Sequence, residues 1–237
     1  MEKPSLRQHI SSQFNAELED VRQRVMAMGG AVEQQIIDAT ESLMTLDANM
    51  ADQVIENDHR INQFEVSIDE ECSRILARRQ PTASDLRLVY SVIKTITDLE
   101  RIGDEARKIA RMASDLASQE RMHEQMREVL HLSRQVTSMV HDALDAFARM
   151  DADAALAVAR QDREVDREYE SLIRQCITFM MEDPRTIRRV MDIIWCVRSL
   201  ERIGDHSKNI SEYVIYFVMG KDVRHLSIEA AEKEVHG

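Results

Sequence analysis

Apolar residues recur along almost the whole chain at intervals of three and four, the pattern of helices that bury one face. In the first half this pattern predicts helices at about 6–46, from 48 to about 80, and from about 83 to 117. Asp47 suits the N-cap of the second helix, and Pro81 interrupts the pattern before the third. The MGG sequence at 28–30 is a candidate kink within the first helix.

The second half repeats this plan. Helices are predicted at about 120–150, after Asp151 and after Pro184. The sequence LERIGD occurs at 99–104 and again at 200–205, an offset of 101 (200 minus 99). Three other pairs share an offset of 104 (151 minus 47): Asp47 and Asp151, Asp58 and Asp162, and Cys72 and Cys176. An internal duplication explains these matches.

We therefore expect an all-α fold of two repeated three-helix bundles with six long helices, placed end to end or side by side. The first repeat is predicted at 1–118 and the second at 119–237. The two repeats differ at their surfaces, since Trp195 occupies the place that Lys94 holds in the first repeat.

Composition supports this fold, and charge limits the classes of molecule that the protein could bind. Gly (6), Pro (3) and aromatic residues (4%) are scarce, as in helical proteins. A net charge of −12 argues against a broad surface for nucleic acid. Three cysteines without a CxxC motif indicate small core residues rather than a disulfide framework. With no signal peptide and no apolar run long enough to span a bilayer, we expect a cytoplasmic protein.

The duplicated LERIGD sequence places two carboxylates one helical turn apart in each half: Glu100 with Asp104, and Glu201 with Asp205. Like charges at this spacing are destabilising, and more so when partly buried, unless a cation neutralises them or their pKa rises. Steps of seven back from the glutamates and the glycines reach apolar positions, which predicts a core-facing seam. These positions are Ile93 and Leu86, Ile194 and Ile187, Ile96 and Val89, and Val197 and Val190.

The preceding helix of each repeat contributes further acids on its apolar stripe, namely Asp58, Asp162 and Asp166. Asn62 stands where the first repeat would match Asp166. Carboxylates on facing helices resemble the way that helical bundles hold metal ions. The hypothesis is therefore a metal site in each repeat, with the ligands Glu100, Asp104, Glu201, Asp205, Asp58, Asp162 and Asp166.

The alternative is that these acids form ordinary helix-surface ion pairs. Asp104 could pair with Lys108, Arg101 or Arg107, and Asp205 with Lys208 or Arg202. Other candidates are weaker. The ExxH pairs Glu56/His59 and Glu120/His123 have a di-iron spacing, but both are interpreted as surface residues. His141 precedes an acid in an ordinary HD pair, and no nucleotide-binding loop or serine-nucleophile motif occurs.

With the paired LERIGD sequences, Asp58 and Asp162, and PTASDLR at 81–87, the chain resembles the PhoU family of bacterial phosphate-signalling regulators over about 9–219. The resemblance implies a non-enzymatic adaptor between the phosphate-specific ABC transporter, through its ATPase subunit, and a sensor histidine kinase. In high phosphate the adaptor would hold the kinase in its inhibitory state and silence the phosphate-starvation response. It would also restrain phosphate uptake, and it would meet the membrane only through these partner proteins.

The resemblance also implies multinuclear metal clusters on the seven acids named above, with iron, zinc, manganese or magnesium as candidates. Asn62, and the PRTIRR sequence at 184–189 that lacks the aspartate of SDLR, depart from the family pattern. Two other readings stay open: a di-metal carboxylate enzyme and a helical scaffold without metal. The lack of inward-facing ExxH pairs favours the adaptor. We expect a homodimer, because long helices often leave an apolar stripe to bury.

Overall fold

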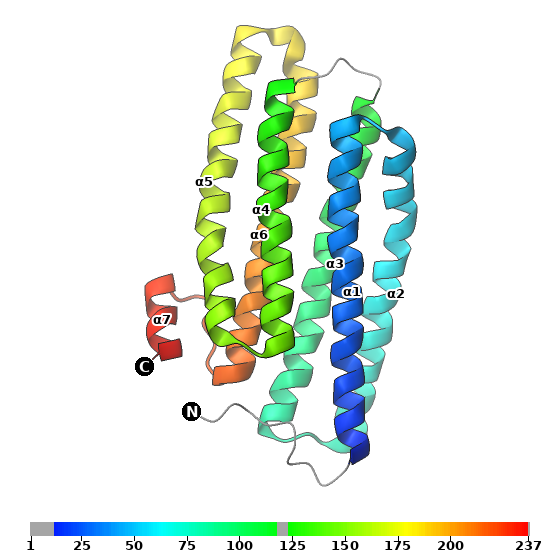
Figure 1. Cartoon of the computed structure of the whole chain (residues 1–237), viewed down its shortest axis with the longest axis vertical. Coiled ribbons are helices and arrows are strands. Elements are labelled where there is room, and N and C mark those ends of the chain that lie inside the picture. Colours follow the sequence, from blue (N-terminus) through cyan, green and yellow to red (C-terminus); the bar gives the residue numbers. More distant parts are fainter. Residues whose placement is uncertain (1–11, 118–122, 237) are drawn as a thin grey trace.

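The computed structural model describes residues 12–117 and 123–236, and these residues are almost entirely helical (Figure 1). No strand occurs within these two ranges, which confirms the all-α prediction. The elements are α1 (Ser12–Thr45), α2 (Ala48–Arg79), α3 (Ala83–Leu116), α4 (His123–Arg149), α5 (Ala152–Glu182), a 3₁₀ turn η2 (Pro184–Thr186), α6 (Ile187–Met219) and α7 (Ile228–His236). Residues 6–11 and 120–122 of the predicted helices lie outside the described ranges.

The predicted caps explain where α2 and α5 begin. The Asp47 carboxylate accepts hydrogen bonds from the Asn49 and Met50 amides, and Asp151 caps α5 in the same way. Both cap the free amides of a first helical turn. Thr82 precedes α3 in an extended conformation but makes no side-chain capping bond. Because equivalent aspartates cap α2 and α5, the second helix begins at an equivalent place in each repeat.

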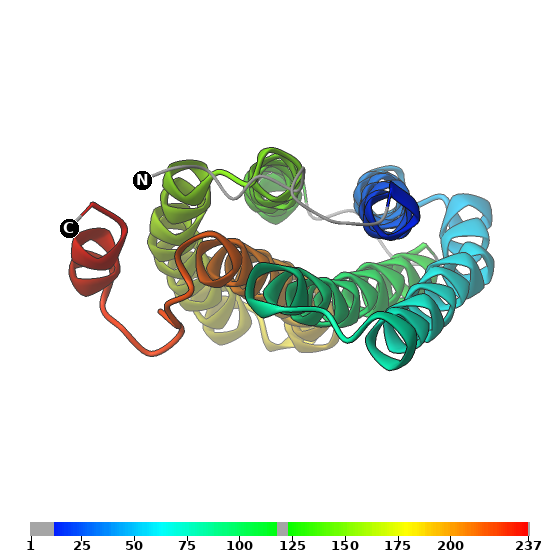
Figure 2. The ribbon, with the colours of Figure 1, turned by 90° about the horizontal axis from the view of Figure 1, so that it is seen from below.

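The two repeats lie side by side rather than end to end. Within each repeat all three helices contact one another, and α3 of the first repeat packs along α6 of the second. Seen along the helices, α3 and α6 are central, α1 and α4 lie on one side of them, and α2 and α5 form the outer edges (Figure 2). One continuous apolar core therefore spans both repeats. The division between residues 118 and 119 stays a prediction, since 118–122 lie outside the described residues.

The core includes all three cysteines, as predicted from the helical stripes. Burial raises the pKa of the Cys72 thiol to about 12, which keeps it protonated and unreactive. The MGG sequence lies inside α1, which continues through it as one helix. Gly29 allows a close approach there, since a Cβ at this position would lie 2.6 Å from Cδ1 of Leu144 on α4.

Beyond Gly29, toward the C-terminal end of α1, a groove lies between α1 and α4. The Thr40 and Ser133 hydroxyls meet at 2.8 Å and form the floor of this groove of about 630 Å³. Residues of α1 and α4 line the groove. These two helices lie on the same side of the central α3 and α6 (Figure 2). The apolar walls of the groove come mainly from Ile37, Met44 and Leu130.

The short helix α7 was not predicted. It packs on α5 through Ala231, which is buried, and through two ion pairs, Arg160–Glu232 and Arg163–Glu229. The first repeat has no counterpart to α7 among the described residues. None of the helices in the described ranges is long and apolar enough to cross a membrane.

Candidate metal centres

The first acidic cluster forms between α2 and α3. Asp58 is buried on α2, where its carboxylate accepts hydrogen bonds from Gln35 Nε2 (3.0 Å) and Arg107 Nη1 (2.8 Å). The same Gln35 amide donates to the Gly103 carbonyl (3.1 Å). Gly103 favours this packing, because a Cβ there would lie 3.0 Å from Cδ1 of Ile61, which would have to shift. The glycine of LERIGD therefore brings a helix backbone close to its neighbour, as the sequence indicated.

Arg107 links Asp58 to the repeated motif. Its second terminal nitrogen lies 2.5 Å from Asp104 Oδ1, so one guanidinium joins a carboxylate of α2 to one of α3. Burial and then the Asp104 charge raise the pKa of Glu100. Burial, and then Glu100, raise the pKa of Glu65 on α2. These shifts place Glu65 with the predicted acids, and we call Asp58, Glu65, Glu100 and Asp104 the α2/α3 cluster.

The second acidic cluster forms between α5 and α6 around a single lysine. Asp162 is buried and accepts a hydrogen bond from Lys208 Nζ at 2.6 Å. Burial raises the pKa of Asp166, Glu201 and Asp205, and in each case neighbouring carboxylates of the group raise it further. The structure thus brings together all four acids predicted for this repeat. We call Asp162, Asp166, Glu201 and Asp205 the α5/α6 cluster.

The predicted seam is only partly inside the core. The apolar residues that precede the glycines by seven and fourteen positions are buried, as are Gly103 and Gly204. The stripe of residues at seven-residue intervals before each glutamate lies at the edge of the core instead. Leu86 and Ile187 on this stripe are exposed, and Glu100 and Glu201 are half-buried. Asp205 is exposed. The expectation that the glutamate stripe faces the core was therefore wrong at Leu86 and Ile187, because neighbouring helices cover only one side of that stripe.

The acids in each cluster are partly neutralised by the protein itself. Among residues 12–117 and 123–236 no group of three histidine, cysteine or acidic side chains is arranged to hold a metal ion in this conformation. Arg107 and Lys208 occupy the places nearest the buried aspartates. Lys208 is a flexible side chain held by one carboxylate, whereas Arg107 is held by two. The cation of the α5/α6 cluster is therefore held by fewer ion pairs than that of the α2/α3 cluster.

Of the ion pairs expected along the helices, Asp104 with Arg107 is confirmed, but the two lysines pair differently. Lys108 pairs with Glu105 (2.9 Å) rather than Asp104, and Lys208 pairs with Asp162 on the neighbouring helix rather than Asp205. Glu105 is buried and also meets Arg202 of α6 at 3.1 Å. The Glu105–Arg202 pair joins the two repeats along α3 and α6. A contact of 2.6 Å between His206 Nδ1 and Asp98 Oδ1 joins the same two helices.

The weaker candidates do not gather at a site. Glu56 and His59 are exposed, as predicted. The side chains of Glu120 and His123 lie outside those that the structure describes. His141 is at the surface, 3.2 Å from Glu33 of α1.

A buried glutamate next to the second cluster was missed in the sequence. Glu212 on α6 is 8% exposed, and burial raises its pKa to about 7 despite the nearby Lys208 charge. It lines a cavity of about 260 Å³ between α5, α6 and α7. A glutamate seven residues after Asp205 is two turns along the same helix face, which is the only signal in the sequence.

The fold and these clusters define a class of protein: a duplicated three-helix bundle with an acidic cluster in each repeat. The family model described as the PhoU domain matches the chain twice, at 25–113 and 129–214. The chain therefore belongs to the PhoU family, which confirms the resemblance seen in the sequence.

Relatives match the chain over nearly its full length. A phosphate-specific transport system accessory protein PhoU homolog from Pseudomonas putida is 58% identical, covering 99% of this chain and 92% of the relative. The phosphate-specific transport system accessory protein PhoU of Escherichia coli is 51% identical, covering 100% and 98%.

Solved structures show the same fold. The crystal structure of PhoU from Pseudomonas aeruginosa has a TM-score of 0.86 and 59% identity, covering 88% of this chain and all of the solved chain. The phosphate transport system regulatory protein PhoU from Streptococcus pneumoniae has a TM-score of 0.83 and 32% identity, covering 89% and 99%.

Proposed function

We propose that this protein is a negative regulator of the phosphate-starvation response. It acts in the cytoplasm as a non-enzymatic adaptor between the ATPase subunit of the phosphate-specific ABC transporter and a sensor histidine kinase, and it restrains phosphate uptake. The observation that carries this proposal is the full-length match to relatives named as accessory or regulatory proteins of phosphate transport. The homodimer expected from the long helices is part of this proposal.

The structure suits an adaptor in physical terms. A continuous core through both repeats makes a stiff body whose opposite faces are held at a fixed separation. Such a body shifts a partner between two conformations only if it binds one of them more tightly. A kinase held in its inhibitory state while the transporter is loaded with phosphate is one such case.

Deleting the gene tests the assignment. We expect the phosphate-starvation response to stay on in high phosphate, measured as the activity of a starvation-induced phosphatase, and a plasmid copy of the gene to restore repression. A response that stays repressed in the deletion strain would contradict the proposed function.

We propose further that the acidic clusters bind divalent metal ions. In the second repeat the ligands are Asp162, Asp166, Glu201 and Asp205, and in the first they are Glu100, Asp104 and Asp58 at a weaker site. The support is chemical: the pKa values of half-buried Glu201 and of Asp205 are raised, and such carboxylates are stabilised by a nearby cation. An all-oxygen donor set suits magnesium and manganese more than zinc, while iron stays a candidate.

Metal analysis of matched double variants tests the sites. Glu201→Gln/Asp205→Asn is expected to lose most of the bound metal, and Glu100→Gln/Asp104→Asn a smaller share, in protein purified without chelator and analysed for metal content. Asp52→Asn/Glu56→Gln is the control, because these two acids have the same spacing on an exposed stretch of α2. Equal metal content in all three variants and the parent would remove both sites.

A further inference from the structure

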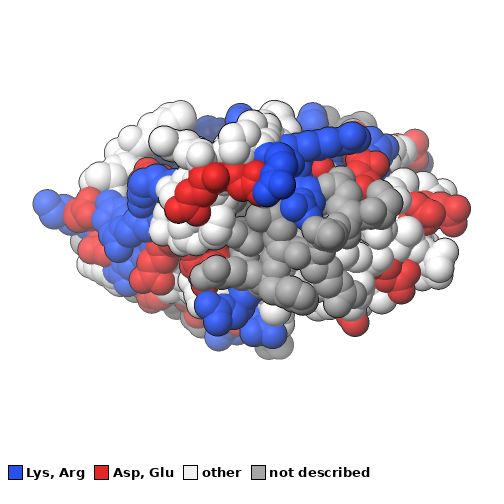
Figure 3. Space-filling model, turned by 90° about the horizontal axis from the view of Figure 1, so that it is seen from above, with Lys and Arg blue, Asp and Glu red and all other residues white. Residues whose placement is uncertain are grey.

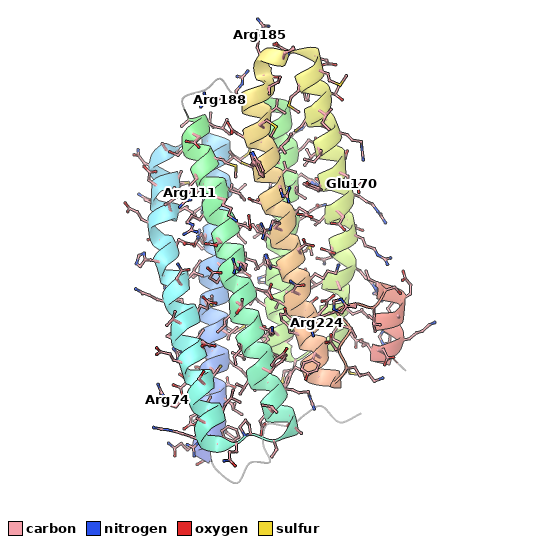
Figure 4. All side chains as sticks on the ribbon, turned by 180° about the vertical axis from the view of Figure 1, so that it is seen from behind. Arg74, Arg111, Glu170, Arg185, Arg188 and Arg224 are labelled. Carbon is pink, nitrogen blue, oxygen red and sulfur yellow. The ribbon has the colours of Figure 1, made fainter. Side chains whose placement is uncertain are left out.

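One face of α6 carries large apolar side chains that nothing in the described chain covers. Ile187, Met191 and Trp195 are 45%, 37% and 50% exposed, at successive steps of four residues. They therefore form a stripe about 12 Å long on one side of the helix. The other sides of α6 pack against α3, α4 and α5. Figure 4 views α3 and α6 from their open side, in front of α1 and α4.

Arginines flank this stripe. Arg188 and Arg198 are exposed and lie three or four residues from its members, on the same side of α6. Neither makes an ion pair within residues 12–117 and 123–236. Arg111 of α3 lies at the same end of the molecule (Figure 4). Figure 3 shows this end from above, where basic and acidic side chains are interspersed.

The matching stripe of the first repeat is different. An offset of 101 pairs Ile187, Met191 and Trp195 with Leu86, Tyr90 and Lys94. Tyr90 packs edge-on against Tyr216 at 5.8 Å between ring centroids, and the Lys94 ammonium lies over the Tyr90 ring at 5.7 Å. Leu86 and Tyr90 are themselves 48% and 42% exposed, so the two stripes differ in chemistry rather than in exposure. The second has an indole where the first has an ammonium group.

We propose that the stripe Ile187–Met191–Trp195, with Arg188 and Arg198, docks an acidic amphipathic helix of a partner protein. Apolar side chains of such a helix would pack on the stripe, and its Asp and Glu residues would pair with the guanidinium groups of Arg188 and Arg198. Tryptophan and arginine are the residues that most often dominate binding energy at protein interfaces. An anionic membrane would be attracted by the same two arginines, so the experiment below compares it with the acidic helix directly. This inference rests on the proposed adaptor function and assigns one of its contact surfaces.

Trp195 makes a direct test feasible, because it is the one tryptophan of the chain and is half exposed. The probe is a designed helical peptide of about 18 residues with leucine on one face and glutamate on the other. We expect saturable binding with a blue shift of the Trp195 emission, weakened by salt. A control peptide with the same leucines but lysine for glutamate should bind at least about tenfold more weakly.

Matched variants locate the site on α6. Arg188→Glu/Arg198→Glu should lower the affinity for the acidic peptide by about tenfold or more while leaving the helical circular dichroism unchanged. The counterpart variant Leu86→Ala/Lys94→Glu, on the first stripe, should bind as the parent does. Trp195→Ala, followed by anisotropy of a labelled peptide, should also lose affinity.

Three results would overturn the proposal: equal binding of both peptides, no binding of the acidic one, or unchanged binding by the Arg188→Glu/Arg198→Glu variant. Binding to a membrane is tested by measuring the Trp195 emission with vesicles of phosphatidylglycerol and phosphatidylcholine. A blue shift with these vesicles and none with the acidic peptide would assign the face to a membrane instead. Because peptide binding is measured on the purified protein, its failure is separate from a failed deletion phenotype, which would contradict the regulator itself.

Discussion

Replacing Arg107 with methionine is expected to lower the free energy of unfolding by about 3–5 kcal/mol at about pH 8. Methionine keeps the length of the side chain but removes the charge that joins Asp58 to Asp104. Asp58 is 2% exposed, so its carboxylate would be left with Gln35 as its hydrogen-bond donor. An uncompensated buried charge is among the most destabilising changes known for single substitutions. Urea unfolding of parent and variant measures the difference.

The loss should shrink as the pH falls. The pKa of Glu100 is already raised by burial, and the Arg107 charge holds it down in part, so removing Arg107 raises it further above its unfolded value. Protonation at lower pH then relieves the repulsion in the folded variant first. Arg101→Met is the control, because Arg101 is mostly exposed and lies 3.7 Å from Glu100; it should change stability by less than about 0.5 kcal/mol. Equal losses in the two variants would show that Arg107 does not compensate the α2/α3 cluster.

Replacing Glu212 with glutamine is expected to stabilise the protein by up to about 3 kcal/mol at about pH 8. The folded-state pKa of Glu212 is about 7, above the ordinary value of 4.5, because burial disfavours the charged form. Between these two values the folded state holds a proton that the unfolded state has lost. Stability of the parent therefore falls as the pH rises through this window, and above it the full cost of ionising a buried carboxyl is present.

The difference between parent and variant should follow the same window. Below about pH 4.5 Glu212 is protonated in both states, so the advantage of Glu212→Gln should vanish. Glu164→Gln is a matched control, since Glu164 is exposed on α5 and should show no such dependence. Chemical unfolding across this pH range gives both curves. A constant difference at every pH would mean that the substitution acts through packing or hydrogen bonding, not through ionisation.

The sequence was sufficient for the helices and for their duplication, because both depend on local rules. The apolar spacing marks each long helix, and Asp47 and Asp151 cap equivalent ones. α7 escaped this reasoning because it has nine residues, of which Ala231 alone is buried. Its position depends on ion pairs to α5 that no local pattern encodes.

The candidate clusters were predicted only in part, for a related reason. Spacing within a helix shows which acids share a face, and it grouped Glu100 with Asp104 and Glu201 with Asp205. It does not show which residue of a neighbouring helix comes opposite. Glu65 was therefore overlooked, although it follows Asp58 by two helical turns. Lys208 likewise reaches across to α5 instead of pairing along its own helix.

The departures from symmetry have a consequence for stoichiometry. Two identical halves would present the same surface twice and would attract two copies of one binding protein with equal strength. Here α7 covers one outer flank, and the indole of Trp195 stands where its twin position holds the ammonium of Lys94. The halves are thereby made inequivalent, so a single chain offers different contacts on its two repeats, and the proposed adaptor would bind one copy each of two unlike proteins.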